Sequence, residues 1–277
     1  MATFHRGDAV IHYTDTGFPE GRPDAATVFF GHGLLFSGWM FGPQIAVLSN
    51  DYRCVTIDWR GQGESPACVS GYDMDTLAAD AAALIGHLGI EPVHYVGLSM
   101  GGFVGQRIAA RQPGLVRSLT LLDTSAGPED PDKAGQYKLL AAIYLLSGIR
   151  PLRKKVLPLM FGSTFLADPA SATVVSEWER RLGRCRRSGI ARAVRGVADR
   201  PAVESEIGSI TAPTLIVVGA DDVATPVPKS RRIAELIAGS RLEVVPDAGH
   251  TSTLEQPEAV TRLIREFLDG LPGPVQT

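Results

Sequence analysis

One serine of this chain lies in a pattern that can present a hydroxyl nucleophile. Residues 97–101 read Gly-Leu-Ser-Met-Gly, a G-x-S-x-G pattern centred on Ser99. The β-branched and aromatic run 93–96 precedes it, and the helix-like stretch 102–110 follows it. Where a strand turns directly into a helix, flanking glycines let the two segments approach closely and hold the serine in a strained conformation. The pattern predicts a nucleophile elbow with Ser99 at its tip.

Two further side chains could complete a proton relay with Ser99. A serine hydroxyl is a poor nucleophile near neutral pH and needs a base within hydrogen-bonding reach, which a third group orients. Asp222 follows the apolar run 214–219, and His250 follows the run 242–245. If these runs are parallel strands, the three side chains lie past strand carboxyl ends, where an open α/β sheet places its ligand site. The chain order Ser, Asp, His predicts His250 as base and Asp222 as acid.

The sequence leaves other candidates for the acid open. Asp221 is adjacent to Asp222, and Asp123 ends another expected strand, from which it could reach the same histidine. The spacing to Pro226 favours Asp222, so the other two aspartates are kept as alternatives.

Three other histidines are less suited to be the base. His12 and His94 lie in strand-like runs, and His87 lies in a helix-like stretch. In such places packing and one hydrogen bond usually satisfy an imidazole. We therefore expect His250 to be the base.

The elements around these residues alternate between strand and helix. Short, nearly continuous apolar runs predict buried parallel strands, and the stretch 74–88 predicts a helix because its leucines recur on one face. The apolar runs lie at residues 28–30, 54–57, 93–96, 119–122, 214–219 and 242–245. The half-polar run 9–17 is instead typical of an antiparallel strand at the sheet edge. Strand alternating with helix predicts a doubly wound, mostly parallel α/β sheet.

The alternation stops after Asp123. A turn-rich stretch follows at 127–132, and from about 136 to 199 the patterns are helical without a strand. We interpret this segment as a helical cap inserted into the α/β domain. The predicted division is a core of residues 1–123 and 206–270, a cap of residues 124–205 and a flexible tail of residues 271–277.

The expected cap combines an apolar stripe with most of the basic charge. Its apolar side chains recur at helical spacing from Trp178 to Val197, with a break expected at 188–189. Residues 150–200 include 12 basic and 4 acidic side chains, a net charge of +8 in a chain whose total is −3. Such a surplus can mark a surface for anions, although a solvated helix face is the more usual reason.

Composition is that of an ordinary globular protein. The 277 residues, 44% of them hydrophobic, suffice for one large α/β domain with an insertion. The net charge gives no reason to expect nucleic acid, and no apolar run reaches the roughly 18 residues of a membrane span. The first residues lack the apolar segment of a signal peptide, so we expect a cytoplasmic protein. Three widely spaced cysteines suggest neither disulfides nor a zinc site, and the cap or edge strands could form a homo-oligomer interface.

Outside the cap, nearly the whole chain resembles the α/β-hydrolase superfamily. Gly-His-Gly at 31–33 is similar to the family's oxyanion motif, and residues 58–65 are similar to its D-x-R-G-x-G-x-S turn. Residues 222–226 and 249–250 match the acid and base loops. Within the superfamily, the elbow is most similar to that of 3-oxoadipate enol-lactonases and related esterases. The resemblance implies an α/β-hydrolase fold that acts without a metal or organic cofactor.

Backbone N–H groups on two loops are expected to stabilise a developing oxyanion. They are those of Met100, directly after the nucleophile, and of Leu34, after the first buried strand. His32 lies between two glycines, which favours a role in loop geometry over a role as a second base. His32, Phe36 and Trp39 are the candidates for substrate contact, although apolar side chains of this kind are as often core.

The residues and the resemblance predict a serine hydrolase of small-molecule carboxylic esters or lactones. Ser99 would attack an acyl carbon while His250 accepts its proton and Asp222 holds the imidazole. A serine at the elbow argues against dehalogenase and epoxide hydrolase chemistry, which uses aspartate there in this superfamily. Hydrolysis of a C–C bond in a vinylogous diketone stays open, although such enzymes more often carry Asn where Leu98 stands. A non-enzymatic ligand receptor on the same fold is a further alternative.

Overall fold

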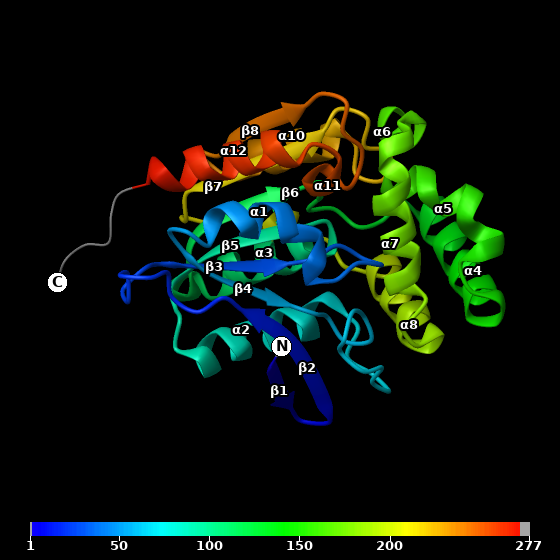
Figure 1. The fold of residues 1–277 in the computed structure, drawn as a ribbon, viewed down its shortest axis with the longest axis horizontal. Helices are drawn as coiled ribbons and strands as arrows, with labels where there is room; N and C mark the ends of the chain where they lie inside the picture. The colour runs from blue at the N-terminus through cyan, green and yellow to red at the C-terminus, as the bar shows by residue number, and fades with distance from the viewer. Residues whose placement is uncertain (1, 272–277) are drawn as a thin grey trace.

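Eight short strands form one sheet in the computed structural model, which describes residues 2–271 (Figure 1). The sheet order is β1-β2-β4-β3-β5-β6-β7-β8; β1 and β2 run antiparallel to their neighbours, and the other pairs are parallel. The strands are β1 (Ala2–Arg6), β2 (Ala9–Asp15), β3 (Thr27–Gly31), β4 (Arg53–Ile57), β5 (Val93–Leu98), β6 (Val116–Leu122), β7 (Thr214–Gly219) and β8 (Arg241–Val245). The predicted α/β architecture is therefore confirmed.

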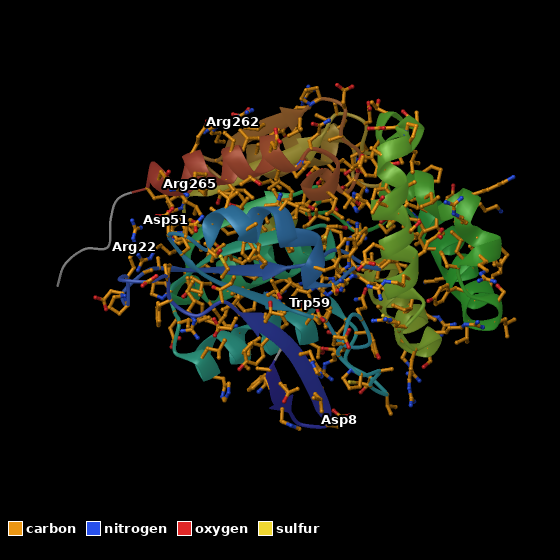
Figure 2. All side chains as sticks on the ribbon, in the orientation of Figure 1. Asp8, Arg22, Asp51, Trp59, Arg262 and Arg265 are labelled. Carbon is orange, nitrogen blue, oxygen red and sulfur yellow. The ribbon has the colours of Figure 1, made fainter. Side chains whose placement is uncertain are left out.

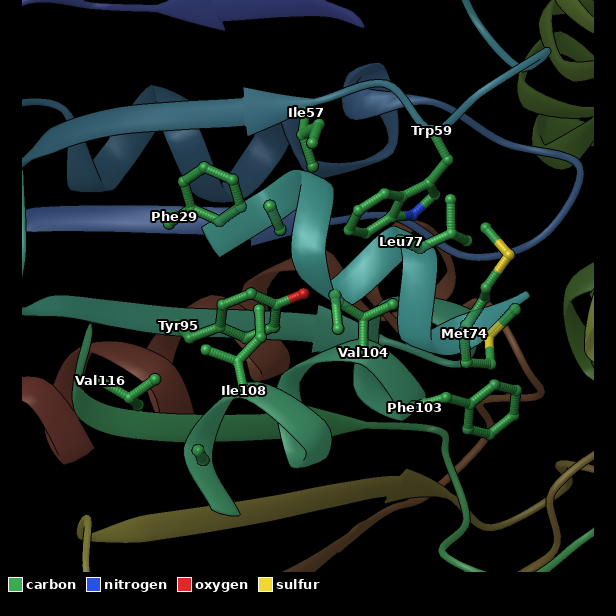
Figure 3. Close-up of a cluster of buried hydrophobic side chains, with 14 of the residues drawn as sticks. Phe29, Ile57, Trp59, Met74, Leu77, Tyr95, Phe103, Val104, Ile108 and Val116 are labelled. Atoms are coloured by element: carbon green, nitrogen blue, oxygen red, sulfur yellow. The ribbon is translucent and has the colours of Figure 1, made fainter. Parts of the chain in front are cut away.

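Alternation along the central strands divides the core into two layers. Val28 and Phe30 pack on one face of the sheet, whereas Phe29 packs on the other, because successive strand residues point to opposite faces. Helices α1 (Gly42–Leu48) and α12 (Pro257–Asp269) cover the first face. The second face is covered by α2 (Met74–Leu88), α3 (Met100–Arg111) and α10 (Val227–Leu236). Figure 3 shows this second layer around Phe29, Tyr95 and Ile108.

Helix α2 has the predicted bounds because both of its ends are specified locally. The Asp73 carboxylate accepts a hydrogen bond from the Thr76 N–H at 2.8 Å and so satisfies a free donor of the first turn. Gly89 ends the helix in the left-handed region at φ 59°, which a residue without Cβ adopts at little cost. Between these ends the apolar stripe packs against α3.

The sheet edge differs from the prediction. The strand expected at the edge, β2, pairs with β4 on one side and with β1 on the other, so β1 is the edge strand. The two strands form a hairpin through Gly7 and Asp8. Only Phe4 of β1 is partly buried, so the strand has no apolar alternation that would reveal it.

Helices occupy the segment between β6 and β7 beyond the carboxyl ends of the parallel strands (Figure 1). We call this helical segment the cap: α4 (Pro131–Ser147), α5 (Arg153–Met160), α6 (Ser163–Ala167), α7 (Ala172–Leu182) and α8 (Arg187–Ala198). A further short helix, α9 (Glu204–Ile207), spans the predicted boundary at residue 205, and the division into core and cap stays a prediction. The predicted tail lies outside the described residues except for Leu271.

The break within the apolar stripe of the cap lies earlier than predicted. Helix α7 ends at Leu182 and α8 begins at Arg187, so Gly189 lies inside a helix and not at its end. Close packing explains this glycine, because a Cβ there would lie 3.0 Å from the Gly61 backbone. The glycine reflects a tertiary contact that sequence alone does not distinguish from a helix break.

Exposed ion pairs occur at the end of the molecule opposite the cap. Asp51 pairs with Arg22 at 2.7 Å and with Arg265 of α12 at 2.6 Å (Figure 2). Pairs at such exposed positions add little stability, so the buried layers hold the sheet and helices together. Within residues 2–271, no helix has the length and apolar character that crossing a membrane requires.

Candidate active site

Ser99 lies at the sharp turn between β5 and α3. Its backbone has φ 50° and ψ −109°, and its N–H donates to the Leu122 carbonyl at 2.9 Å. A Cβ at Gly101 would overlap the Gly31 carbonyl of the neighbouring strand, so a glycine is required at that position. The predicted strand, turn and helix are present, and they hold Ser99 at the carboxyl edge of the sheet.

The structure brings Ser99, His250 and Asp222 together. The Ser99 Oγ lies 2.9 Å from His250 Nε2, and His250 Nδ1 lies 2.9 Å from the Asp222 carboxylate. All three side chains are buried, and each residue follows the carboxyl end of a strand, β5, β8 or β7. This arrangement can pass a proton from the hydroxyl to the imidazole while the carboxylate holds the ring.

The loop after β7 holds the Asp222 carboxylate in its charged form. The N–H groups of Ala224 and Thr225 donate to one oxygen at 2.8 and 2.9 Å, and the Thr225 hydroxyl donates to the other at 2.7 Å. Burial alone would raise the pKa of Asp222, but the charge and hydrogen bond of His250 and the bonds from Thr225 lower it overall. In turn, burial would lower the pKa of His250, but the charge and hydrogen bond of Asp222, with smaller contributions from other acidic groups, raise it overall.

The other two aspartates do not contact the imidazole. Asp221 is exposed. Asp123 is buried, and its oxygens accept hydrogen bonds from the Gly219 N–H at 2.8 Å and the Ser252 hydroxyl at 2.5 Å. Burial, and then the charge of Asp222, raises the pKa of Asp123 well above its usual range. Geometry and charge therefore favour Asp222 as the acid.

The two predicted oxyanion donors lie on the loops that flank Ser99. Met100 is the first residue of α3, and Leu34 lines the cavity in front of Ser99. Within residues 2–271, no protein acceptor takes a hydrogen bond from either backbone N–H. A hydrogen bond stabilises the loop around Leu34: the N–H of the next residue, Leu35, donates to Gln62 Oε1 at 2.8 Å.

Comparison with known proteins identifies the family of the chain. The family model described as the alpha/beta hydrolase fold matches residues 26–257. The chain belongs to the α/β-hydrolase family.

Similar proteins include enol-lactonases and an esterase. This hydrolase is 29% identical to 3-oxoadipate enol-lactonase 2 of Acinetobacter baylyi over 94% of this chain and 98% of the relative. A crystal structure of the enol-lactonase from Burkholderia xenovorans has a TM-score of 0.88 at 26% identity, with coverage of 97% and 100%. A thermophilic esterase from Thermogutta terrifontis has a TM-score of 0.85 at 29% identity, with coverage of 94% and 93%. The predicted resemblance and the hydrolase class are confirmed.

His32 of this hydrolase is fully buried and does not line the cavity, contrary to the prediction of substrate contact. Its Nδ1 hydrogen-bonds the Gly33 carbonyl at 2.7 Å, and its Nε2 accepts the Trp59 N–H at 3.0 Å. Burial, the largest effect, lowers the pKa of His32 to about 4. The neutral ring joins the Leu34 loop to the turn at Trp59.

Phe36 and Trp39 also lie outside the cavity lining, which corrects the prediction of substrate contact for both. Phe36 packs between Phe161 and Trp178, with ring centroids 6.1 and 6.2 Å away. Trp39 lies against Phe36, and the Arg181 guanidinium lies over the Trp39 ring, 5.1 Å from the centroid of that ring. These aromatic side chains attach the cap to the loop after β3. They belong to the packed core, which was the alternative to substrate contact.

The cap supplies most of the cavity wall, which the sequence did not identify. The lining side chains from the cap helices and the turns between them are mainly aliphatic or aromatic: Tyr137, Leu140, Ala141, Tyr144, Ile149, Leu152, Val156, Leu159, Met160, Leu182, Ile190, Val194 and Val197. None of the basic side chains of residues 150–200 lines it. The surplus of positive charge therefore faces away from the cavity.

Sequence reasoning also missed Glu255, which holds the loop that carries His250. Its carboxylate accepts the N–H groups of Gly249 and Thr251, on either side of His250, at 2.8 and 2.9 Å. It also accepts the Gly162 N–H of the cap at 2.8 Å. A buried acidic side chain five residues after the base is a signal that a search for hydrogen-bond acceptors could have found. Among the described residues, no group of three or more acidic, histidine or cysteine side chains could hold a metal ion.

Proposed function

We propose that this hydrolase cleaves a carboxylic ester or lactone through an acyl-enzyme formed on Ser99. The observation that carries the proposal is the continuous hydrogen-bonded path from the Ser99 hydroxyl through His250 to Asp222. Such a path lets a neutral imidazole accept the hydroxyl proton as the oxygen attacks. The relatives named enol-lactonase and esterase support the same class of substrate.

The reaction follows from where the groups lie. The Ser99 oxygen attacks the acyl carbon, His250 Nε2 takes the proton, and the Asp222 charge stabilises the imidazolium. The N–H groups of Met100 and Leu34 stabilise the tetrahedral oxyanion. His250 then gives the proton to the leaving alkoxide, which stays attached to the acyl group when the substrate is a lactone. Water attacks the acyl-enzyme with His250 again as the base and releases the acid.

Substitution of the nucleophile tests the proposal. Ser99→Ala removes the attacking atom, and we expect kcat to fall roughly 10⁴–10⁶-fold, as in other hydrolases with this relay. Purified protein is assayed on 4-nitrophenyl esters of increasing chain length, on lactones and on vinylogous diketones. Ser147→Ala is the control, because Ser147 is exposed and its hydroxyl bonds a carbonyl within α4.

Three outcomes separate the alternatives. Hydrolysis of esters or lactones by the parent chain, together with covalent labelling of Ser99 by a fluorophosphonate, supports the proposal. Cleavage of the diketone C–C bond without ester or lactone hydrolysis would assign the other reaction. Tight ligand binding by a chain that neither turns over substrate nor reacts with the fluorophosphonate would indicate a receptor.

A further inference from the structure

The charge inside the cavity differs from the charge of the cap surface. Among residues 2–271, Glu129 and His250 are the acidic or basic side chains that line the cavity. The wall around them consists largely of aliphatic side chains from the cap. Beyond the relay, Glu129 is therefore the charged side chain that the described residues place in the cavity wall.

Two cations hold Glu129, and neither of them reaches the cavity. Arg200 Nη1 lies 3.0 Å and Lys229 Nζ 3.4 Å from the two Glu129 oxygens. The Arg200 guanidinium lies over the Phe103 ring, 4.2 Å from its centroid, and Phe103 itself lines the cavity. Burial would raise the pKa of Glu129, but the charges of Arg200 and then Lys229 lower it overall, so the carboxylate is ionised.

This arrangement turns the negative end of a buried ion pair toward the substrate. The Arg200 side chain is 1% exposed and is not among the side chains that line the cavity, and its Nη1 and Nη2 also donate to the Val197 carbonyl and the Ser125 hydroxyl. A substrate carboxylate would lose its hydration in an apolar cavity and meet a like charge without a cation to pair with. An uncharged acyl chain loses no such hydration and buries its apolar surface.

We propose that the cavity selects uncharged, apolar acyl groups and excludes substrates that carry a carboxylate, with Glu129 as the residue that determines this specificity. The inference rests on the proposed ester or lactone hydrolysis and narrows its substrate class. It gives the basic surplus of the cap no part in attracting an anionic substrate, in line with the interpretation of that surplus as a solvated helix face.

The first experiment compares three activated esters of equal acyl length. They are 4-nitrophenyl hexanoate, the mono-4-nitrophenyl ester of adipic acid, and the methyl ester of that adipate, which has its bulk without its charge. We expect kcat/KM for the two neutral esters to exceed that for the free acid by at least about 100-fold. A free acid hydrolysed within tenfold of its methyl ester would overturn the inference.

The second experiment changes the charge of the wall. Glu129→Gln keeps an oxygen that can accept from Arg200 and leaves the positive charges of Arg200 and Lys229 uncompensated. We expect the ratio of kcat/KM for the methyl ester to kcat/KM for the free acid to fall at least about tenfold, because the cavity then favours an anion. Glu206→Gln is the control: Glu206 pairs with Arg111 at an exposed site, so the ratio should stay unchanged. An unchanged ratio in a folded Glu129→Gln protein would refute the role of Glu129.

A binding measurement separates this inference from the proposed reaction. The anilides of hexanoic acid, adipic acid and methyl adipate resemble the esters but have a stable amide bond. Calorimetry on the parent chain should give a Kd for the free acid at least about 100-fold weaker than for its methyl ester. If no ester is hydrolysed but this difference in Kd is found, the proposed reaction fails and the charge selection stands. Equal Kd values would refute the charge selection whatever the turnover.

Discussion

The relay at Ser99 depends on which of two neighbouring carboxylates is charged. Asp222 and Asp123 are both buried near His250, and ionisation of both carboxyl groups so close together would be electrostatically unfavourable. The loop after β7 gives Asp222 three hydrogen bonds, and the imidazole is a fourth partner, whereas Asp123 accepts hydrogen bonds from the Gly219 N–H and the Ser252 hydroxyl. The charge therefore resides on Asp222.

Removal of that charge should change both the rate and its pH dependence. Asp222→Asn should lower kcat about 10⁴-fold, because the ring loses its orienting acceptor. In the parent chain Asp222 raises the pKa of His250, and only the neutral imidazole can accept the Ser99 proton. Activity is thus lost as pH falls through a raised pKa, and in Asp222→Asn the acid limb of kcat/KM should move to lower pH. The measurement is a pH profile of kcat/KM for both proteins.

Asp221→Asn is the matched control for this substitution. It makes the same chemical change at the adjacent, exposed residue, so both the rate and the acid limb should stay those of the parent chain. A large loss in Asp221→Asn with little loss in Asp222→Asn would contradict the assignment of the acid.

At the scale of elements, the loop after β8 is fixed to both the sheet and the cap. Glu255 accepts N–H groups on both sides of His250 and one from the cap, and the Thr251 hydroxyl donates to the Met160 carbonyl at the end of α5 at 2.5 Å. The base is therefore positioned by contacts that also locate the cap. In the proposed reaction, Glu255 acts through His250 as a positioning residue.

Glu255→Gln should weaken turnover more than substrate binding. One carboxamide cannot accept all three N–H groups, because its NH₂ group is a donor. We expect kcat to fall about 10–100-fold with KM nearly unchanged, because a small displacement of the base costs rate without changing the cavity. The acid limb should also move slightly to lower pH, since the charge of Glu255 raises the pKa of His250.

Steady-state kinetics on one ester provide this test, with Glu258→Gln as an exposed control on α12. A parallel loss of stability in Glu255→Gln with unchanged kcat and unchanged acid limb would show that Glu255 is only structural.

Elements whose ends are specified locally were predicted best. Helix α2 was predicted with the bounds that the structure has, because its apolar stripe has a helical period; in the structure Asp73 and Gly89 specify its two ends. The break between α7 and α8 was misplaced, because the glycine at 189 serves a close contact with Gly61. Strand β1 was missed because it buries little of its own surface and depends on pairing with β2.

At the scale of the whole molecule, one tryptophan joins the cap to the sheet. The Trp178 side chain is fully buried, packs against Phe36 and Phe161, and its indole N–H donates to the Leu35 carbonyl at 3.1 Å. It therefore connects α7 to the loop after β3, next to the expected oxyanion donor Leu34. The packing of the cap and the shape of the site depend on the same contacts.

Trp178→Ala should destabilise the whole chain. Removal of a fully buried tryptophan leaves a cavity and typically costs about 3–5 kcal/mol of unfolding free energy. Urea unfolding monitored by circular dichroism measures this loss, and Val69→Ala, at an 81% exposed site, is the control. A loss below about 1 kcal/mol would show that the cap packs independently of this contact.

The sequence by itself determined the parts that local chemistry encodes. The elbow at Ser99, the order of nucleophile, acid and base, and the alternation of strand and helix all depend on residues close together in the chain. The helical character of the cap could be predicted for the same reason. The predicted roles of Ser99, His250 and Asp222 agree with the contacts that the structure has.

Only the tertiary structure decided which side chains face the substrate. His32 lies in the oxyanion motif, and Phe36 and Trp39 follow it in sequence. The hydrogen bond of His32 with Trp59 and the packing of Phe36 against Trp178 and Trp39 place all three outside the cavity lining. None of the basic side chains of residues 150–200 lines the cavity, whereas Glu129, which had no distinguishing pattern, lines it and pairs with Arg200, 71 residues away. The direction of a side chain depends on how helices pack on one another, and this packing cannot be predicted from the local periodicity of the sequence.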